Sequence, residues 1–126
     1  MTDKIKEVSI HMGTFDFTVN FIYGDYEEAT KYVDEKFEES ADHEVHNKGY
    51  TARGRTWNKP SYCPIVWIPR KPSTPREYAT LAHEMFHATC VLLHWAGVPL
   101  TDASEEVYAH AQAHLITSAI AGMRAK

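Results

Sequence analysis

Three residues in the second half of the chain have the types and spacing that bind a metal ion and activate water. They are His83, Glu84 and His87, which form the pattern H-E-x-x-H in a sequence of 126 residues. Residues four apart lie on the same face of a helix, so the two imidazoles can bind one metal ion. The glutamate between them can then accept a proton from water at that ion. The pattern predicts a zinc site with His83 and His87 as ligands and Glu84 as general base.

The segment around this pattern has strong helix signals at both ends. Thr74 has the type of an N-cap residue, Pro75 suits the first helical position, and Glu77 lies three residues after the cap. Gly97 is typical of the residue that follows a helix. We therefore expect an active-site helix over about residues 75–96, with the motif in its rigid middle.

A catalytic zinc ion takes three protein ligands and leaves one position for water, so a third ligand is needed. A second helix, expected over about residues 105–123, begins with Glu105 and Glu106. Adjacent helical residues point roughly 100° apart, so at most one of them faces the site. We prefer Glu106, which aligns with His110 one turn later, and keep Glu105 as the alternative. The apolar side of this helix is predicted as Val107, Ala111, Leu115 and Ala119.

Other histidines are weaker ligand candidates. His94 lies seven residues after His87, about 10.5 Å further along a helix axis, which is too far for the same ion. His43 and His46 lie in a polar, aperiodic segment where no other residue has ligand spacing, so we expect them to face solvent.

The motif, followed by 18 residues and then Glu106, resembles the gluzincin metallopeptidases. Their third zinc ligand is a glutamate on the next helix. The stretch EEVYAHAQAHL is also similar to small H-E-x-x-H proteins of bacteriophages and prophages and, more loosely, to ImmA/IrrE-type peptidases. The resemblance covers residues 74–120 and implies a zincin-like fold, a zinc cofactor and a peptide substrate. It departs from the gluzincin pattern at His110, where the family often has an acid that supports a zinc ligand.

Hydrophobic periodicity predicts the elements that carry this site. Alternating apolar and polar residues indicate half-buried strands, the first two forming an antiparallel hairpin. Asp25 and Glu28 have capping-box spacing and predict a helix after that hairpin. The fold class is therefore α+β: a single minimal zincin-like domain of residues 1–126, with a small, mainly antiparallel four-stranded sheet packed on three helices. The predicted strands are residues 5–12, 15–21, 50–57 and 62–68.

The last strand is the candidate for substrate binding. Pro64 has no N–H to donate, which places the strand over residues 62–68 at the edge of the sheet or makes it start later. An edge strand can bind an extended peptide as an additional strand, with Ile65 or Trp67 shaping a subsite. The oxyanion of the reaction needs a donor besides the metal. The candidates for that donor are Tyr62, Tyr108, His110 and His114.

Composition excludes several other classes of function. The net charge of −4 provides no basic field for nucleic acid, and no apolar run approaches the length of a membrane span. The N-terminus lacks the apolar core of a signal peptide, which favours a cytoplasmic protein. Cys63 and Cys90 are too few for a disulfide scaffold and are expected as reduced thiols. Three hypotheses remain: a zinc peptidase, a zincin-fold regulatory or binding protein without proteolysis, and a structural helix pair with an incidental motif.

Overall fold

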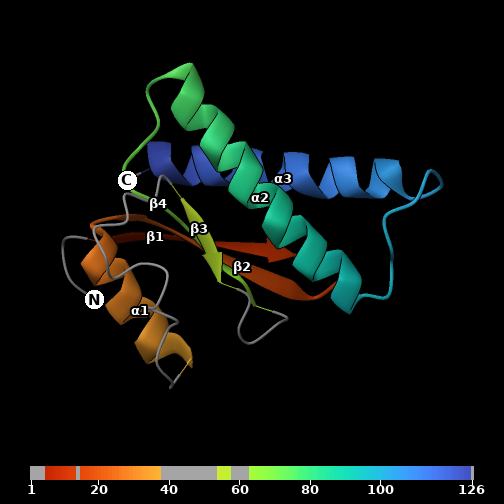
Figure 1. Cartoon of the computed structure of the whole chain (residues 1–126), viewed down its shortest axis with the longest axis horizontal. Helices are drawn as coiled ribbons and strands as arrows, with labels where there is room; N and C mark the ends of the chain where they lie inside the picture. The colour runs from red at the N-terminus through yellow and green to blue at the C-terminus, as the bar shows by residue number, and fades with distance from the viewer. Residues whose placement is uncertain (1–4, 14, 38–53, 58–62, 126) are drawn as a thin grey trace.

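The computed structural model describes residues 5–13, 15–37, 54–57 and 63–125, with the backbone alone at residue 37. Sequence-based predictions for His43, His46 and Tyr62 lie outside these residues. The described chain is an α+β fold with four strands and three helices (Figure 1). In chain order these are β1 (Ile5–Met12), β2 (Phe17–Gly24), α1 (Tyr26–Phe37), β3 (Arg55–Trp57), β4 (Ile65–Ile68), α2 (Pro75–Trp95) and α3 (Glu105–Arg124).

The four strands form one sheet in the order β1-β2-β4-β3. β1 and β2 pair antiparallel over their whole length, from Ile5 opposite Gly24 onwards, which confirms the predicted hairpin. β4 pairs antiparallel with β3 and parallel with β2. A parallel pair requires a long crossover connection, and α1 forms part of it. The sheet is thus mixed, with two antiparallel pairings out of three.

Of the two possibilities that Pro64 left for the strand over residues 62–68, the edge position is wrong and the later start is confirmed. β4 lies between β2 and β3, so both of its sides are paired. Pro64 is accommodated because the strand begins one residue later, at Ile65, and the Pro64 carbonyl accepts a hydrogen bond from the N–H of Asn20 at 3.0 Å. Within the described residues, β3 is the edge strand on this side of the sheet.

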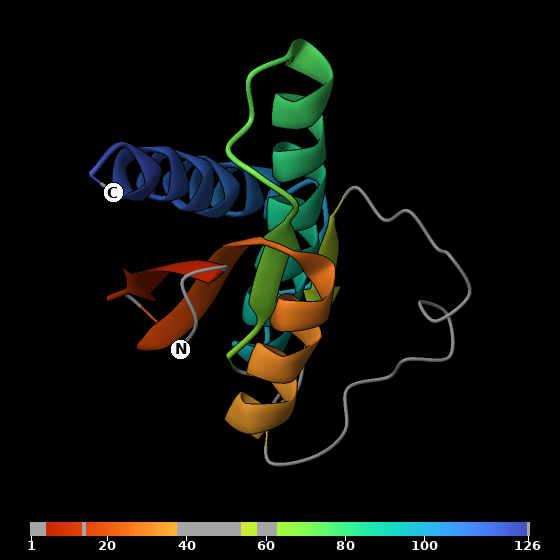
Figure 2. The ribbon, with the colours of Figure 1, turned by 90° about the vertical axis from the view of Figure 1, so that its left-hand side faces the viewer.

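The two faces of the sheet are covered differently (Figure 2). α2 and α3 pack on one face and α1 packs on the other, as the two clusters of buried side chains show. The alternation of side chains along β2 explains this arrangement: Phe21 and Ile22 are both fully buried, and they belong to opposite clusters. The central strand therefore needs cover on both faces.

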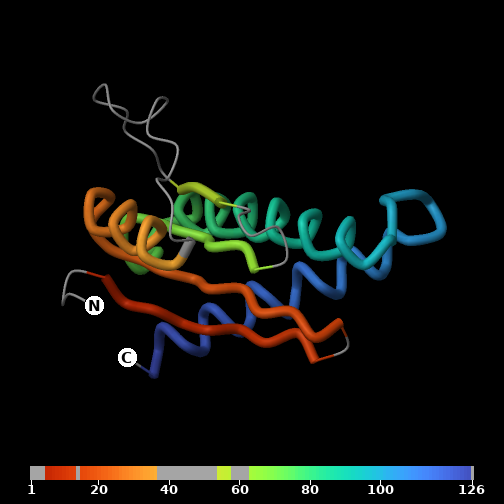
Figure 3. Tube along the Cα trace, turned by 90° about the horizontal axis from the view of Figure 1, so that it is seen from below, coloured from red at the N-terminus to blue at the C-terminus, as the bar shows by residue number. Residues whose placement is uncertain are grey.

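α2 is anchored along one stripe, as its periodicity predicts. Leu81, Met85 and Leu92 are fully buried against the sheet. α3 runs beside the β1–β2 hairpin (Figure 3), and Gly122 allows the close approach because a Cβ there would meet the side chain of Val8. No helix within the described part of the chain combines the length and apolar character that a membrane crossing needs.

Candidate metal centre

The motif lies in the middle of α2, which has the predicted capping box at its start. The Thr74 hydroxyl accepts from the N–H of Glu77, and the Glu77 carboxylate accepts from the N–H groups of Thr74 and Ser73. The bond from Ser73 is the main cause of the lowered pKa of Glu77, with a smaller contribution from the Arg70 guanidinium at 2.8 Å. Two turns of well-anchored helix thus precede the motif and hold its direction.

His83 and His87 lie side by side on the exposed surface of α2. Their Nε2 atoms are 3.2 Å apart, and their rings meet edge to face. Two nitrogen ligands of a tetrahedral zinc ion lie about 3.3 Å apart, given Zn–N bonds of about 2.0–2.1 Å. The pair therefore already has the separation that two neighbouring zinc ligands require.

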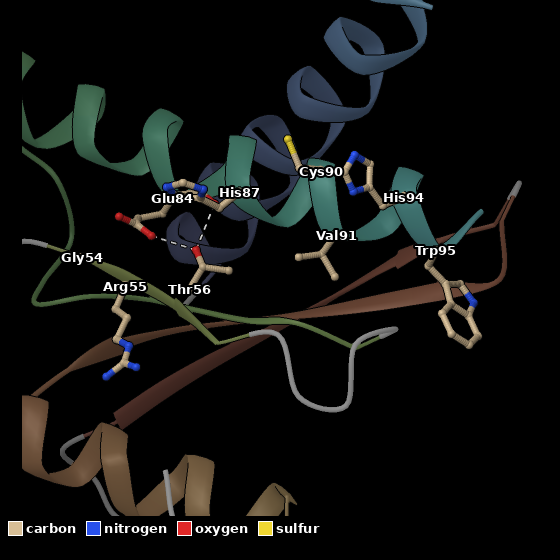
Figure 4. A pocket seen from close by; sticks show the side chains of 9 residues that line it. All are labelled: Gly54, Arg55, Thr56, Glu84, His87, Cys90, Val91, His94 and Trp95. Carbon is tan, nitrogen blue, oxygen red and sulfur yellow. Dashed lines mark hydrogen bonds between the residues drawn. The ribbon is translucent and has the colours of Figure 1, made fainter. Parts of the chain in front are cut away.

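Glu84 is on the adjacent face and is buried, with 8% of its surface exposed. Its Oε1 accepts a hydrogen bond from the Thr56 hydroxyl at 2.8 Å (Figure 4). Its Oε2 lies 4.0 Å from Nε2 of His83. A carboxylate seldom leaves water without a partner, because desolvation penalises its charge. Here the partner comes from β3, the edge strand, which packs against α2 at this point.

A groove of about 660 Å³ lies between β3 and α2. It begins at Glu84 and ends near Trp95, and burial raises the pKa of the Cys90 thiol within it. His94, which the spacing excludes as a ligand of the same ion, lines this groove in an exposed position. Its lining residues are Gly54, Arg55, Thr56, Glu84, His87, Cys90, Val91, His94 and Trp95.

The structure does not bring Glu106 to the two histidines. Its side chain is 86% exposed and pairs with His110 of the next turn at 3.3 Å. Among the described residues, no three His, Cys, Asp or Glu side chains are grouped so that they could hold a metal ion. The third ligand, Glu106 with Glu105 as the alternative, therefore stays a prediction.

Three of the four residues predicted on the apolar side of α3 are buried, namely Ala111, Leu115 and Ala119, and Val107 is the exception. Val107 is instead 39% exposed, whereas Tyr108 is 2% exposed. Contacts with α2 come from Tyr108, whose ring lies against Phe86, and from Gln112, which donates to the carbonyl of Ala82 at 3.0 Å.

The preference for Glu106 rested on its alignment with His110, and both of these side chains are exposed. Glu106 lies about 200° around the helix from Tyr108, on the side away from α2. Glu105 lies only about 60° from Tyr108, in the row that leads to Gln112. Of the two acids, Glu105 is thus on the side of α3 that contacts α2.

None of the described candidates for the oxyanion donor lies in the groove. The Tyr108 hydroxyl is used within the fold, since it donates to the Val98 carbonyl at 2.6 Å, and burial raises its pKa. His110 and His114 line a separate cavity of about 500 Å³ at the tip of the β1–β2 hairpin, together with His11.

Two residues at the site had no role in the interpretation of the sequence. Thr56 and Gly54 lie on a segment that was predicted only as a strand. Alternation along a strand places Gly54 and Thr56 on one face, and this could have been inferred from the sequence. The sequence did not indicate which helix packs against that face.

Comparison of the chain with models of known protein families, with characterised proteins and with solved structures gave no match. The functional conclusion therefore depends on the geometry above.

Proposed function

We propose that the chain is a minimal zincin-like, zinc-dependent metallopeptidase that acts in the cytoplasm on an extended peptide or protein. One observation carries the proposal. A buried glutamate, Glu84, is anchored by an edge strand beside two histidines whose Nε2 atoms are 3.2 Å apart. Burial of a carboxylate costs free energy, and an incidental motif on a structural helix pair would not require Glu84 to be buried and hydrogen-bonded to a strand.

In this proposal, His83 and His87 hold the zinc ion through Nε2. A bound zinc ion acidifies water and polarises a substrate carbonyl. Glu84 accepts the water proton and later delivers it to the leaving amine. Its Oε2 is suited to this task, because Oε1 already accepts from Thr56 and Oε2 lies on the side of His83.

The substrate lies along β3 rather than along β4. β3 is at the edge of the described sheet and borders the groove that begins at Glu84. An extended peptide can add to such an edge by main-chain hydrogen bonds, with the groove receiving its side chains.

The proposal needs a third ligand from α3. Glu106 is the residue that the resemblance to gluzincins implies, and Glu105 is the acid on the side of α3 that contacts α2. Glu105→Gln and Glu106→Gln separate them, because only the variant that lacks the ligand loses zinc affinity, by about a hundredfold or more. Isothermal titration of the metal-free protein with zinc measures this loss.

Glu84→Gln tests the hydrolytic role. The variant keeps the histidines and should bind about one equivalent of zinc, as measured by mass spectrometry of the metal content. Its cleavage of fluorescein-labelled casein should fall about 10²–10⁴-fold, the usual contribution of a general base. Cleavage at the wild-type rate would show that Glu84 is not the base.

A second function is favoured by one observation, the position of Glu106 away from the histidine pair. The chain is then a zincin-fold regulatory or binding protein that holds zinc without proteolysis. Zinc binding by the wild-type protein, together with no cleavage of casein at any zinc concentration, would support this alternative.

A further inference from the structure

β3 presents two residues to α2 at the point where Glu84 is buried. Strand side chains alternate, so Gly54 and Thr56 face one way and Arg55 faces the other. Figure 4 shows this directly: Thr56 points to Glu84, whereas Arg55 points away from it. The guanidinium of Arg55 lies over the ring of Trp57, at 4.7 Å from its centroid. The face of β3 toward the active-site helix is thus formed by one glycine and one hydroxyl group.

The Thr56 hydroxyl lies close to two acceptors of the same residue. It is 2.8 Å from Oε1 of Glu84 and 3.1 Å from the backbone carbonyl of Glu84. A hydroxyl has a single proton and donates to one acceptor at a time. Hydrogen bonds to an ionised acceptor are shorter and stronger, so the carboxylate is the preferred one.

Gly54 closes the space on the other side of the glutamate. A Cβ at this position would lie 2.9 Å from Cγ of Glu84 and 3.3 Å from the backbone oxygen of Trp67. Any side chain here would push the glutamate or the strand aside. The glutamate therefore has little room to change rotamer while both residues are in place.

We infer that Thr56 is a positioning residue for Glu84: its hydroxyl holds Oε1, so that Oε2 is the oxygen that accepts the proton. The inference rests on the proposed peptidase function for its catalytic consequence. Without the hydroxyl, the carboxylate can rotate about its last torsion and exchange its two oxygens. A misplacement of about 1 Å in a catalytic group can lower the rate about a hundredfold.

Thr56→Val tests the inference in the zinc-loaded full chain, because valine has the shape of threonine without the hydroxyl. The probe is a quenched-fluorescent peptide that spans a bond cleaved in labelled casein. We expect kcat to fall about tenfold to a hundredfold, with KM and zinc content unchanged. Thr56→Ser restores the hydroxyl and should return kcat to within about threefold of the wild-type value.

Thr89→Val is the matched control. Thr89 is buried on the same helix, and its hydroxyl donates to the Met85 carbonyl at 2.8 Å, away from Glu84. This variant loses the same chemical group and should keep its kcat. An unchanged kcat in Thr56→Val, a loss confined to KM, or a loss that Thr56→Ser does not restore would each overturn the inference.

A second measurement does not depend on activity. Urea unfolding of the metal-free wild type, Thr56→Val, Glu84→Gln and the double variant forms a double-mutant cycle. Non-additive changes in the free energy of unfolding support the contact between hydroxyl and carboxylate, and additive changes overturn it. If the wild type does not cleave labelled casein, the peptidase proposal fails, and the cycle still decides whether Thr56 holds Glu84.

Discussion

α2 and α3 each carry a pair of histidines four residues apart, and the two pairs lie in different surroundings. His83 and His87 stand next to a buried glutamate, and His87 borders the groove along β3. His110 and His114 line a cavity at the hairpin tip, and within the described part of the chain no strand residue bonds to the acid beside them. Identical spacing in the sequence has thus produced two different settings.

The difference lies in the carboxylates. Glu84 is 8% exposed and bonded to Thr56, whereas Glu106 has a side chain that is 86% exposed and pairs with His110. An ion pair at such an exposed position contributes little, because water screens it. Histidine spacing alone therefore does not define a metal site. A strand that packs against the neighbouring acid distinguishes a candidate general base from an exposed surface charge.

The largest expected effect is a loss of zinc affinity, which should follow substitution in the α2 histidine pair but not in the α3 pair. His83→Ala removes one ligand and should weaken zinc binding about a hundredfold or more. His110→Ala, the matched change on α3, should leave the affinity of the first equivalent within about threefold. Isothermal titration with zinc, on protein freed of metal, measures both. Equal losses in the two variants would remove the distinction between the pairs.

A smaller effect is expected at Gly54 and Gly122, two glycines whose missing side chain lets another segment pack closely against them. Gly54→Ala crowds Glu84, and Gly122→Ala crowds Val8. Each should lower the free energy of unfolding, because overpacking costs about 1–3 kcal/mol. At Gly122 the better helix propensity of alanine offsets about 1 kcal/mol of this cost.

Only the first of these two variants should affect the site. We expect Gly54→Ala to lower kcat on the quenched-fluorescent peptide and Gly122→Ala to leave it unchanged. Urea unfolding followed by circular dichroism gives the stability of each, so that a loss of folded protein is not mistaken for a loss of activity. A Gly54→Ala variant with wild-type kcat would contradict the view that β3 confines Glu84.

The smallest effect concerns the starts of the two helices. α2 has a capping box, whereas Ser104 makes no side-chain cap bond at the start of α3. The pKa of Glu77 is below its ordinary value of 4.5, first because of the Ser73 N–H. A lowered pKa means that Glu77 stabilises the fold fully above about pH 4.5 and loses this contribution as the pH falls through its folded pKa.

Glu77→Gln should therefore be less stable than the wild type at pH 7, and the two should converge as the pH falls below about 4.5. Urea midpoints measured from pH 7 to pH 3 follow this convergence. Glu105→Gln at the start of α3 is the control and should show a smaller pH-dependent difference. A Glu77→Gln difference that is the same at pH 3 and pH 7 would contradict the role of the ionised carboxylate.

Local signals predicted much of the fold correctly. The hairpin, the capping box at Thr74 and the cap at Asp25, which accepts from the N–H of Glu28 at 3.2 Å, all depend on residues close in sequence. Such features are determined by side-chain periodicity and by short-range hydrogen bonds, so they can be read from the chain.

Two predictions were correct only in part, because their outcome depends on residues that are distant in the sequence. For β4, Pro64 allowed an edge position or a later start; the strand begins at Ile65 and is central, so the edge position was wrong. On α3, the predicted burial of Ala111, Leu115 and Ala119 is confirmed, but Tyr108 is buried in place of Val107. Val107 and Tyr108 are adjacent and both can be buried in a core. Which of the two is buried depends on the segments that pack against the helix.

By itself, the sequence determined that His83, Glu84 and His87 share one region of a helix, because four-residue spacing and helix caps are local properties. It did not determine which acid of α3 faces that helix, or that Thr56 would reach Glu84 from 28 residues away along the chain. Those relations depend on strand order and helix phase. Both are set by which apolar surfaces are buried together, and that burial is a property of the whole fold.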